Sequence, residues 1–134
     1  MKDLREAIDK AVFADVNHEE RYELLRERIL RDPTAFKDNY RESLCYLLAL
    51  NLDCYNHITD LYDFEENCII PDAVNSAWQT SSSRRTTDLA FNLFTGSCLW
   101  CEGEESRCAV SEIFNCDYAP YFMEAVKIWA YAVF

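Results

Sequence analysis

Residues 43–52 read SLCYLLALNL, a segment with apolar side chains on nearly every face of a helix. A helix of that kind has to be covered on all sides, so we place it at the centre of the core. Asp32 followed by Pro33 is a helix-start signal, because proline suits the first helical position. These signals predict one helix from Pro33 through the segment, with an inward stripe of Phe36, Tyr40, Leu44, Leu47 and Leu48.

The chain has 134 residues but two glycines and three prolines. β-Rich folds need many tight turns, and turns need those residues, so we expect an all-α fold. We expect a single domain over 1–134 with six to eight helices, several of them short, and residues 1–16 as a candidate helical extension. Apolar spacing places the other helices at about 2–14, 18–31, 53–62, 71–78, 84–94, 106–114 and 119–133, and a short strand near 68–70. The last helix is expected to face inward with Phe122, Ala125, Val126, Trp129 and Val133.

Residues 61–96 read LYDFEENCIIPDAVNSAWQTSSSRRTTDLAFNLFTG and carry the unusual features of the chain. The net charge is −11, and residues 42–83 hold seven acids but no lysine or arginine. Direct nucleic-acid binding needs basic patches, so the charge argues against it. It suits a solvated face, or attraction to a basic protein surface. Gly96 is the expected stop of the helix that begins at Arg84 or Arg85.

Carboxylates on this stretch and beside it are the candidate partner-binding residues, namely Asp53, Asp60, Asp63, Glu65, Glu66 and Asp72. On a rigid frame they could imitate the phosphates of a nucleic acid. A metal site is disfavoured because the run lacks the Asp-x-Asp-x-Asp-Gly calcium loop. Ser83, Arg84 and Arg85 form a candidate anion site at a helix start. The simpler interpretation is that a serine caps that helix and an arginine pairs with the acidic segment.

Seven cysteines, no signal peptide and no apolar run long enough for a membrane helix predict a cytoplasmic protein with mostly buried, reduced thiols and no membrane partner. The series Cys98, Cys101, Cys108 and Cys116 begins with a C-x2-C pair, which is typical of zinc sites. Its second half lacks a matching spacing, so unligated thiols and no cofactor are favoured. A structural zinc or thiol-redox protein is the alternative.

Neither histidine has the partners of a catalytic centre. His18 is expected on the surface at a helix start. His57 lies near Asp60, a pairing that could serve acid–base chemistry, yet no nucleophile or phosphate-loop motif accompanies it. A hydrolase or transferase is therefore the least favoured class, and a non-enzymatic role the most favoured.

Several motifs resemble a domain-of-unknown-function family of small helical proteins from bacteria, phages and mobile elements. The shared residues are His18, Arg21, Tyr22, Leu24, Leu25, 44–51, Tyr62-Asp63-Phe64, Ile69, Pro71, Trp78-Gln79-Thr80-Ser81, Leu89 to Phe94, Phe114 and Glu124-Ala125. The cysteines after Gly96 lie outside the resemblance. The family implies no activity. Its mobile-element setting implies an inhibitor like the anti-CRISPR proteins, which occupy a basic groove of an RNA-guided nuclease. The sequence leaves the partner and the oligomeric state open.

Overall fold

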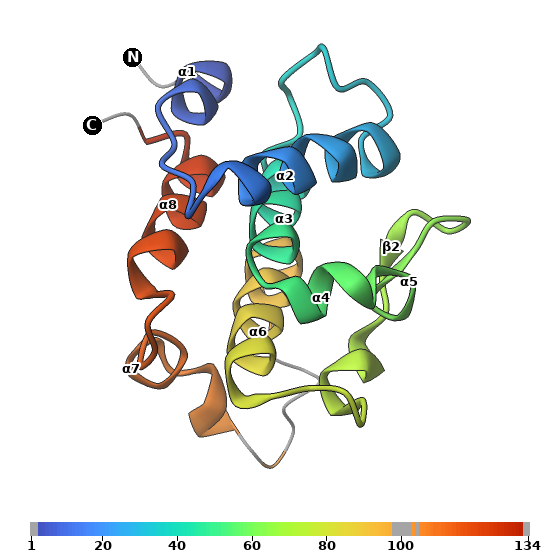
Figure 1. Cartoon of the computed structure of the whole chain (residues 1–134), viewed down its shortest axis with the longest axis vertical. Coiled ribbons are helices and arrows are strands. Elements are labelled where there is room, and N and C mark those ends of the chain that lie inside the picture. The colour runs from blue at the N-terminus through green and yellow to red at the C-terminus, as the bar shows by residue number, and fades with distance from the viewer. Residues whose placement is uncertain (1–2, 98–102, 104, 133–134) are drawn as a thin grey trace.

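The computed structural model describes residues 3–97, 103 and 105–132. These ranges hold eight α-helices, two 3-10 helices and one two-stranded antiparallel sheet, which confirms the all-α prediction (Figure 1). The elements are α1 (Leu4–Asp9), α2 (Val16–Ile29), α3 (Asn39–Leu50), α4 (Leu52–Asn56), α5 (Ile58–Leu61), β1 (Tyr62–Asp63), β2 (Cys68–Ile69), η1 (Pro71–Asn75), α6 (Ser81–Thr95), η3 (Glu105–Cys108), α7 (Val110–Ile113) and α8 (Ala119–Ala130).

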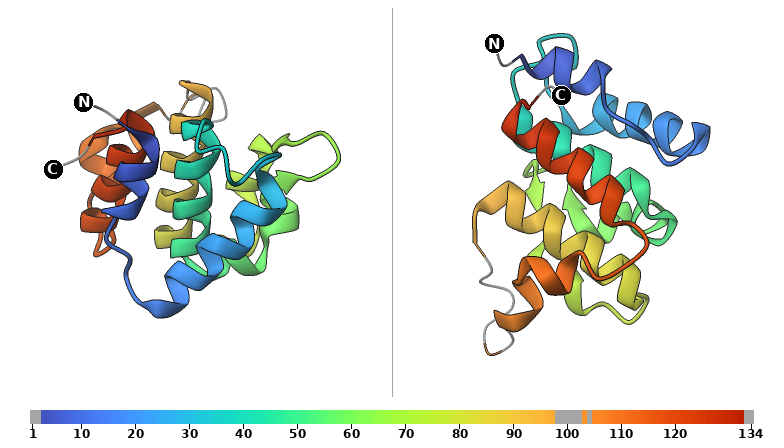
Figure 2. Two further views of the ribbon diagram at one scale, coloured as in Figure 1. Left: turned by 90° about the horizontal axis from the view of Figure 1, so that it is seen from above. Right: turned by 90° about the vertical axis from the view of Figure 1, so that its left-hand side faces the viewer.

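Helix α3 is the centre of the fold. Every residue from Ser43 to Asn51 is buried, as the apolar sequence predicts, and so is Glu42, whereas Tyr40 and Leu52 are exposed, contrary to the prediction. Helices α2, α6 and α8 all pack against α3 and cover it from different sides (Figure 2). Burying a leucine side chain contributes about 1.5–3 kcal/mol, so the leucines of α3 are a main source of stability. The result is one compact domain around a single helix.

Helix α8 covers α3 with a stripe that differs from the predicted one. Phe122, Ala125 and Ile128 are buried, whereas Trp129 is 36% exposed, so the inward placement of Trp129 was wrong. The apolar residues of α8 extend round more than one face, and only packing on α3 selects which of them point inward. Helix α1 packs on the same α8 and buries Leu4, Ala7 and Ile8.

The predicted helix start at Pro33 was also wrong, because α3 begins at Asn39. Asp32 instead closes a turn with its carboxylate, which accepts from the N–H of Thr34. Phe36 has a left-handed φ of 49°, which no helix contains. Arg26 of α2 holds this turn by donating to the carbonyl of Pro33 (2.6 Å) and lying over the Phe36 ring. A tertiary contact thus overrides the local helix signal.

His18 is fully buried, contrary to the surface position expected for it. Its Nδ1 accepts the N–H of Ala14 (3.0 Å), and its Nε2 lies 2.9 Å from the carbonyl oxygen of Tyr46. The rings of Phe13 and Tyr46 pack edge-on against the imidazole. The helix-start signal itself is genuine: α2 begins at Val16, and Asp15 caps it by accepting from the N–H of His18. Phe13 and Ala14, which precede α2, fold back over the imidazole of His18. No local pattern in the sequence predicts this contact.

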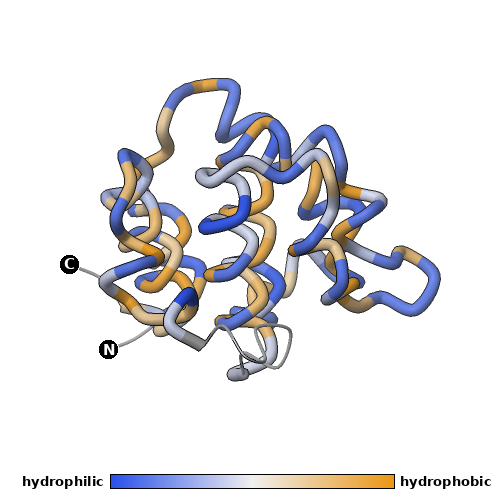
Figure 3. Tube along the Cα trace, turned by 90° about the horizontal axis from the view of Figure 1, so that it is seen from below, coloured by the Kyte–Doolittle hydropathy of each residue, from blue (hydrophilic) through white to orange (hydrophobic). Residues whose placement is uncertain are grey.

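The acidic half of the chain forms short elements. The predicted strand near 68–70 is confirmed as β2, which pairs with β1 in the register Tyr62 with Ile69 and Asp63 with Cys68. The tip of this hairpin is hydrophilic (Figure 3). Helix α6 begins at Ser81, ahead of the expected start at Arg84 or Arg85. It ends at Thr95, and the next residue, Gly96, has a φ of 73° and confirms the predicted stop. No helix among the described residues is long and apolar enough to cross a membrane.

Candidate functional site

The predicted partner-binding carboxylates lie on neighbouring elements. Helices α4 and α5, the β1–β2 hairpin and η1 gather on the flank of the molecule opposite α8 (Figure 1). We call the six residues on these elements the acidic flank: Asp53, Asp60, Asp63, Glu65, Glu66 and Asp72. All except the half-buried Asp63 are exposed. The structure therefore brings to one side residues that the sequence spreads over twenty positions.

Asp63 differs from the others because it shapes the hairpin. Its Oδ1 accepts hydrogen bonds from the N–H groups of Glu65 (2.9 Å) and Glu66 (3.0 Å). Asn67 follows in the left-handed region with a φ of 57°, which completes the turn. Arg28 of α2 lies over the ring of Phe64, 4.2 Å from its centre, and fixes the hairpin against the body. The carboxylate of Asp63 thus stabilises the turn that carries the two glutamates.

No member of the acidic flank forms an ion pair with a lysine or arginine of the described chain. Seven carboxylates elsewhere are paired, namely Glu6, Asp9, Asp38, Glu42, Asp88, Glu112 and Glu124, whereas Glu20, Glu23 and Glu27 of α2 form no ion pair within the described chain. The negative charge of the flank is therefore not compensated within the part that the structure describes. Attraction to an external positive surface is the direct electrostatic consequence.

An aromatic stack stands inside the acidic flank. The imidazole of His57 lies parallel to the indole of Trp78, with 4.2 Å between ring centres and 7° between planes. Trp78 donates from Nε1 to Oδ2 of Asp60 (3.1 Å), and Nδ1 of His57 lies 2.9 Å from the carbonyl oxygen of Asp53. No hydrogen bond joins the side chains of His57 and Asp60, so the acid–base pairing considered from the sequence is not formed between these two described side chains.

A recess of about 500 Å³ opens beside this stack. Asp60, Asp72 and Trp78 line it together with Thr59 and Ser76. We call it the acidic recess. Two carboxylates and an indole edge around an open hollow are the groups that recognise a guanidinium or an ammonium. Asp53 and the hairpin acids do not line this recess and lie on the elements around it.

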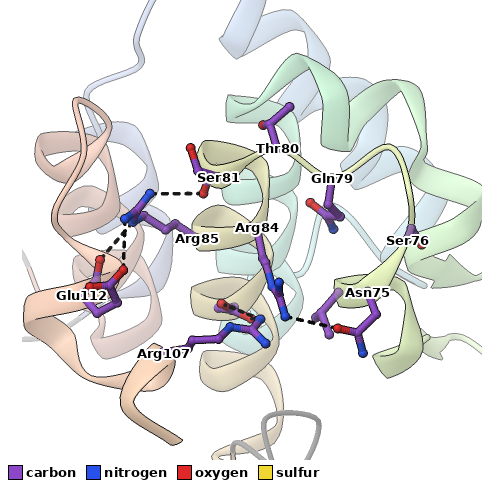
Figure 4. A pocket seen from close by; sticks show the side chains of 11 residues that line it. Asn75, Ser76, Gln79, Thr80, Ser81, Arg84, Arg85, Arg107 and Glu112 are labelled. Carbon is purple, nitrogen blue, oxygen red and sulfur yellow. Dashed lines mark hydrogen bonds and ion pairs between the residues drawn. The ribbon is translucent and has the colours of Figure 1, made fainter. Parts of the chain in front are cut away.

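A second cavity, of about 410 Å³, shares Ser76 with the acidic recess as a lining residue (Figure 4). It contains both arginines of the predicted anion site and a third from far along the chain. We call it the arginine cavity. Its charged lining consists of Arg84, Arg85, Asp88, Arg107 and Glu112.

Each arginine of this cavity has a defined contact. Arg84 donates from Nη2 to Oδ1 of Asn75 (3.2 Å). Arg85 donates from Nη2 to Oε1 of Glu112 (3.0 Å) and from Nε to the carbonyl of the same residue (3.1 Å). Arg107 donates from Nη2 to both carboxylate oxygens of Asp88 (3.1 and 3.2 Å). The guanidiniums join α6 to η3 and α7.

Ser83 does not belong to the arginine cavity, so its assignment to the anion site was wrong. It is fully buried in the cap of α6, where its hydroxyl accepts from the N–H of Thr80 (2.8 Å) and donates to Oε1 of Gln79. Ser83 takes part in the capping box of α6 from the third helical position, but the N-cap residue is Thr80 and not the expected serine. The other interpretation, an arginine pairing with the acidic segment, was wrong in its partner, since Arg85 pairs with Glu112. No signal in the sequence indicates Arg107, because it joins the cavity through tertiary packing.

The cysteines give no metal centre among the described residues. Cys98 and Cys101 lie outside those residues, and Cys108 and Cys116 are half-buried. Burial raises the pKa of the Cys54 thiol to about 12 and raises that of Cys45 well above its ordinary value, so both are protonated. Cys68 is exposed, which the expectation of mostly buried thiols did not anticipate.

Comparison with known proteins identifies a family without assigning a function. No curated protein and no solved structure matches the chain. A family model described as "Family of unknown function (DUF6075)" matches residues 8–133. That range includes the helices of the core, the acidic flank and the arginine cavity. The chain therefore belongs to this family of unknown function, DUF6075.

Proposed function

We propose that the chain is a non-enzymatic interaction module whose acidic flank occupies a basic, nucleic-acid-binding groove of a partner protein. The observation that carries the proposal is that six carboxylates, none of which has an ion pair within the described chain, gather on neighbouring elements of one flank. Complementary charge of this kind steers a partner and fixes its register.

The partner class follows from the charge and the spacing. Carboxylates on α5, the hairpin and η1 present negative groups from several rigid elements, as the backbone of a nucleic acid does. RNA-guided nucleases hold their heteroduplex in a positively charged channel. We therefore propose an antagonist of such a host nuclease, of the kind carried by phages and mobile elements. It would act in the cytoplasm, where the exposed thiol of Cys68 stays reduced.

A competition assay tests this proposal. A purified RNA-guided nuclease is loaded with guide RNA and labelled target duplex, and the chain is added at increasing concentration. We expect displacement of the duplex. The triple variant Asp63→Asn, Glu65→Lys and Glu66→Lys should weaken displacement at least about tenfold, since each removed charge pair contributes on the order of 1 kcal/mol. Asparagine at position 63 retains a carbonyl that can accept the two N–H bonds of the turn.

The matched control carries the same kind of change on helix α2, where Glu20, Glu23 and Glu27 are exposed. The variant Glu20→Gln, Glu23→Lys and Glu27→Lys alters the net charge equally but leaves the flank intact. If both triple variants lose activity to the same extent, total charge and not the flank is responsible. Undiminished displacement by the flank variant contradicts the proposal, provided that its unfolding midpoint matches the wild type.

A further inference from the structure

We propose that the arginine cavity binds the phosphate group of a small phosphorylated molecule. This site is separate from the acidic flank, and it does not depend on the function proposed above. The inference starts from its position in the fold. Three segments meet there: Asn75 and Ser76 at the end of η1, the first turns of α6, and Arg107 of η3 (Figure 4).

The cavity gathers three arginines although the chain as a whole is acidic. Three guanidiniums and two carboxylates line the cavity, whereas the whole chain carries −11. The side chains of Arg85 and Arg107 are only 22% and 18% exposed. Charges that are withdrawn from water interact more strongly, so an anion in the cavity would be attracted to these two guanidiniums more strongly than on an open surface.

The pairing of the arginines is compatible with a ligand. The side chain of Glu112 is 48% exposed, so it can turn toward water when an anion takes its place beside Arg85. Asp88 is nearly buried and holds Arg107 through Nη2, which orients that guanidinium at the cavity. An arginine fork matches the oxygens of a phosphate in two parallel hydrogen bonds, which a lysine cannot provide.

The size of the cavity indicates a small molecule. A volume of about 410 Å³ lies within the ordinary range for sites of small ligands, and it exceeds what one phosphate group needs. Hydroxyls of Ser76 and Ser81 and the side chain of Val74 supply polar and apolar contacts for the rest of the ligand. A nucleic acid is disfavoured as the source of the phosphate, because a polyanion would be repelled by the net charge of the chain.

Isothermal titration with sodium pyrophosphate at low ionic strength tests the proposal. The full chain should bind one pyrophosphate with saturable heat. Arg84→Gln should weaken the affinity at least about tenfold, and Arg84→Lys should restore only part of it. The control is Arg31→Gln, which removes the same charge from an exposed position outside the cavity and should change the affinity less than about twofold.

Three results would overturn the proposal: no saturable heat up to millimolar pyrophosphate, an equal loss in Arg31→Gln and Arg84→Gln, or tighter binding of a ten-nucleotide single strand than of pyrophosphate at the same salt. The variant Arg107→Gln removes the ion-pair partner of the nearly buried Asp88, so this variant can fail to fold. The decision therefore rests on Arg84, which donates to the exposed Asn75.

Discussion

His18 and Tyr46 are joined at the centre of the molecule, with 2.9 Å between the imidazole Nε2 and the main-chain carbonyl oxygen. Because Nδ1 accepts the N–H of Ala14, it carries no proton, and Nε2 must be the donor to Tyr46. The ring is therefore neutral and uses both nitrogens. Protonation of Nδ1 would leave two N–H groups facing each other in a buried site.

This arrangement predicts a loss of stability in acid. Burial is the largest cause that lowers the pKa of His18 from its ordinary 6.5. Below pH 6.5 the unfolded chain takes up a proton that the folded chain refuses, so the stability present above pH 6.5 falls as the pH drops toward the folded pKa. The slope from one proton is at most about 1.4 kcal/mol per pH unit.

Urea unfolding of the wild type and of His18→Gln, measured between pH 7.5 and 5.5, checks the prediction. Glutamine retains one donor and one acceptor but does not titrate. The difference in unfolding free energy between the two proteins should shrink as the pH falls. A difference that stays constant over this interval would show that His18 is not the titrating group.

The buried ion pair between Arg26 and Glu42 should be a large single contribution to stability. Nε of Arg26 donates to Oε1 of Glu42, whose side chain is fully buried. Glu42→Ala leaves the guanidinium without its partner, and we expect a loss of about 3–5 kcal/mol. Asp9→Ala removes an exposed ion pair with Arg5 and should cost less than about 0.5 kcal/mol in the same denaturation assay. Equal costs would contradict the argument from burial.

The thiols should react in an order set by exposure and pKa. Cys68 is exposed, whereas Cys45 and Cys54 are buried with raised pKa values. Since the thiolate is the reactive form, iodoacetamide at pH 8 should label Cys68 in the native protein and label the buried pair only after unfolding. Peptide mass spectrometry of timed samples gives the order. Early labelling of Cys45 would mean that this residue is exposed, which would contradict its position in the core.

Gly96 should be hard to replace at the end of α6. Its φ of 73° suits glycine, and beyond its two chain neighbours no described atom lies within 4 Å of where a Cβ would stand. Gly96→Ala therefore tests backbone strain without a steric clash, and we expect a loss of about 1 kcal/mol in unfolding free energy. Thr95→Ala, one residue earlier in helical conformation, serves as a reference for side-chain loss at the same helix end. If the unfolding midpoint of Gly96→Ala equals that of the wild type, the argument from backbone strain is wrong.

Local signals in the sequence predicted the elements better than their contacts. The period of apolar residues located most helices, and the all-round apolar character of residues 43–52 identified the central one. Gly96 ended its helix where expected because a left-handed residue is a local requirement. The helix expected at Pro33 failed because Arg26, remote in sequence, holds that segment as a turn.

The candidate site shows the same difference between what the sequence predicts and what only tertiary contacts decide. Sequence alone located the acidic residues and two of the three arginines, since clusters of charge are visible in a linear chain. It could not show that Trp78 covers His57, that Arg107 completes the cavity with Arg84 and Arg85, or that Ser83 is buried. The sequence by itself determined the helical class, the central helix and the sign of the charge, because these depend on composition and local periodicity. Tertiary structure decided which side chains meet, because contacts between distant segments arise from how the helices pack around α3, and no local pattern encodes that packing.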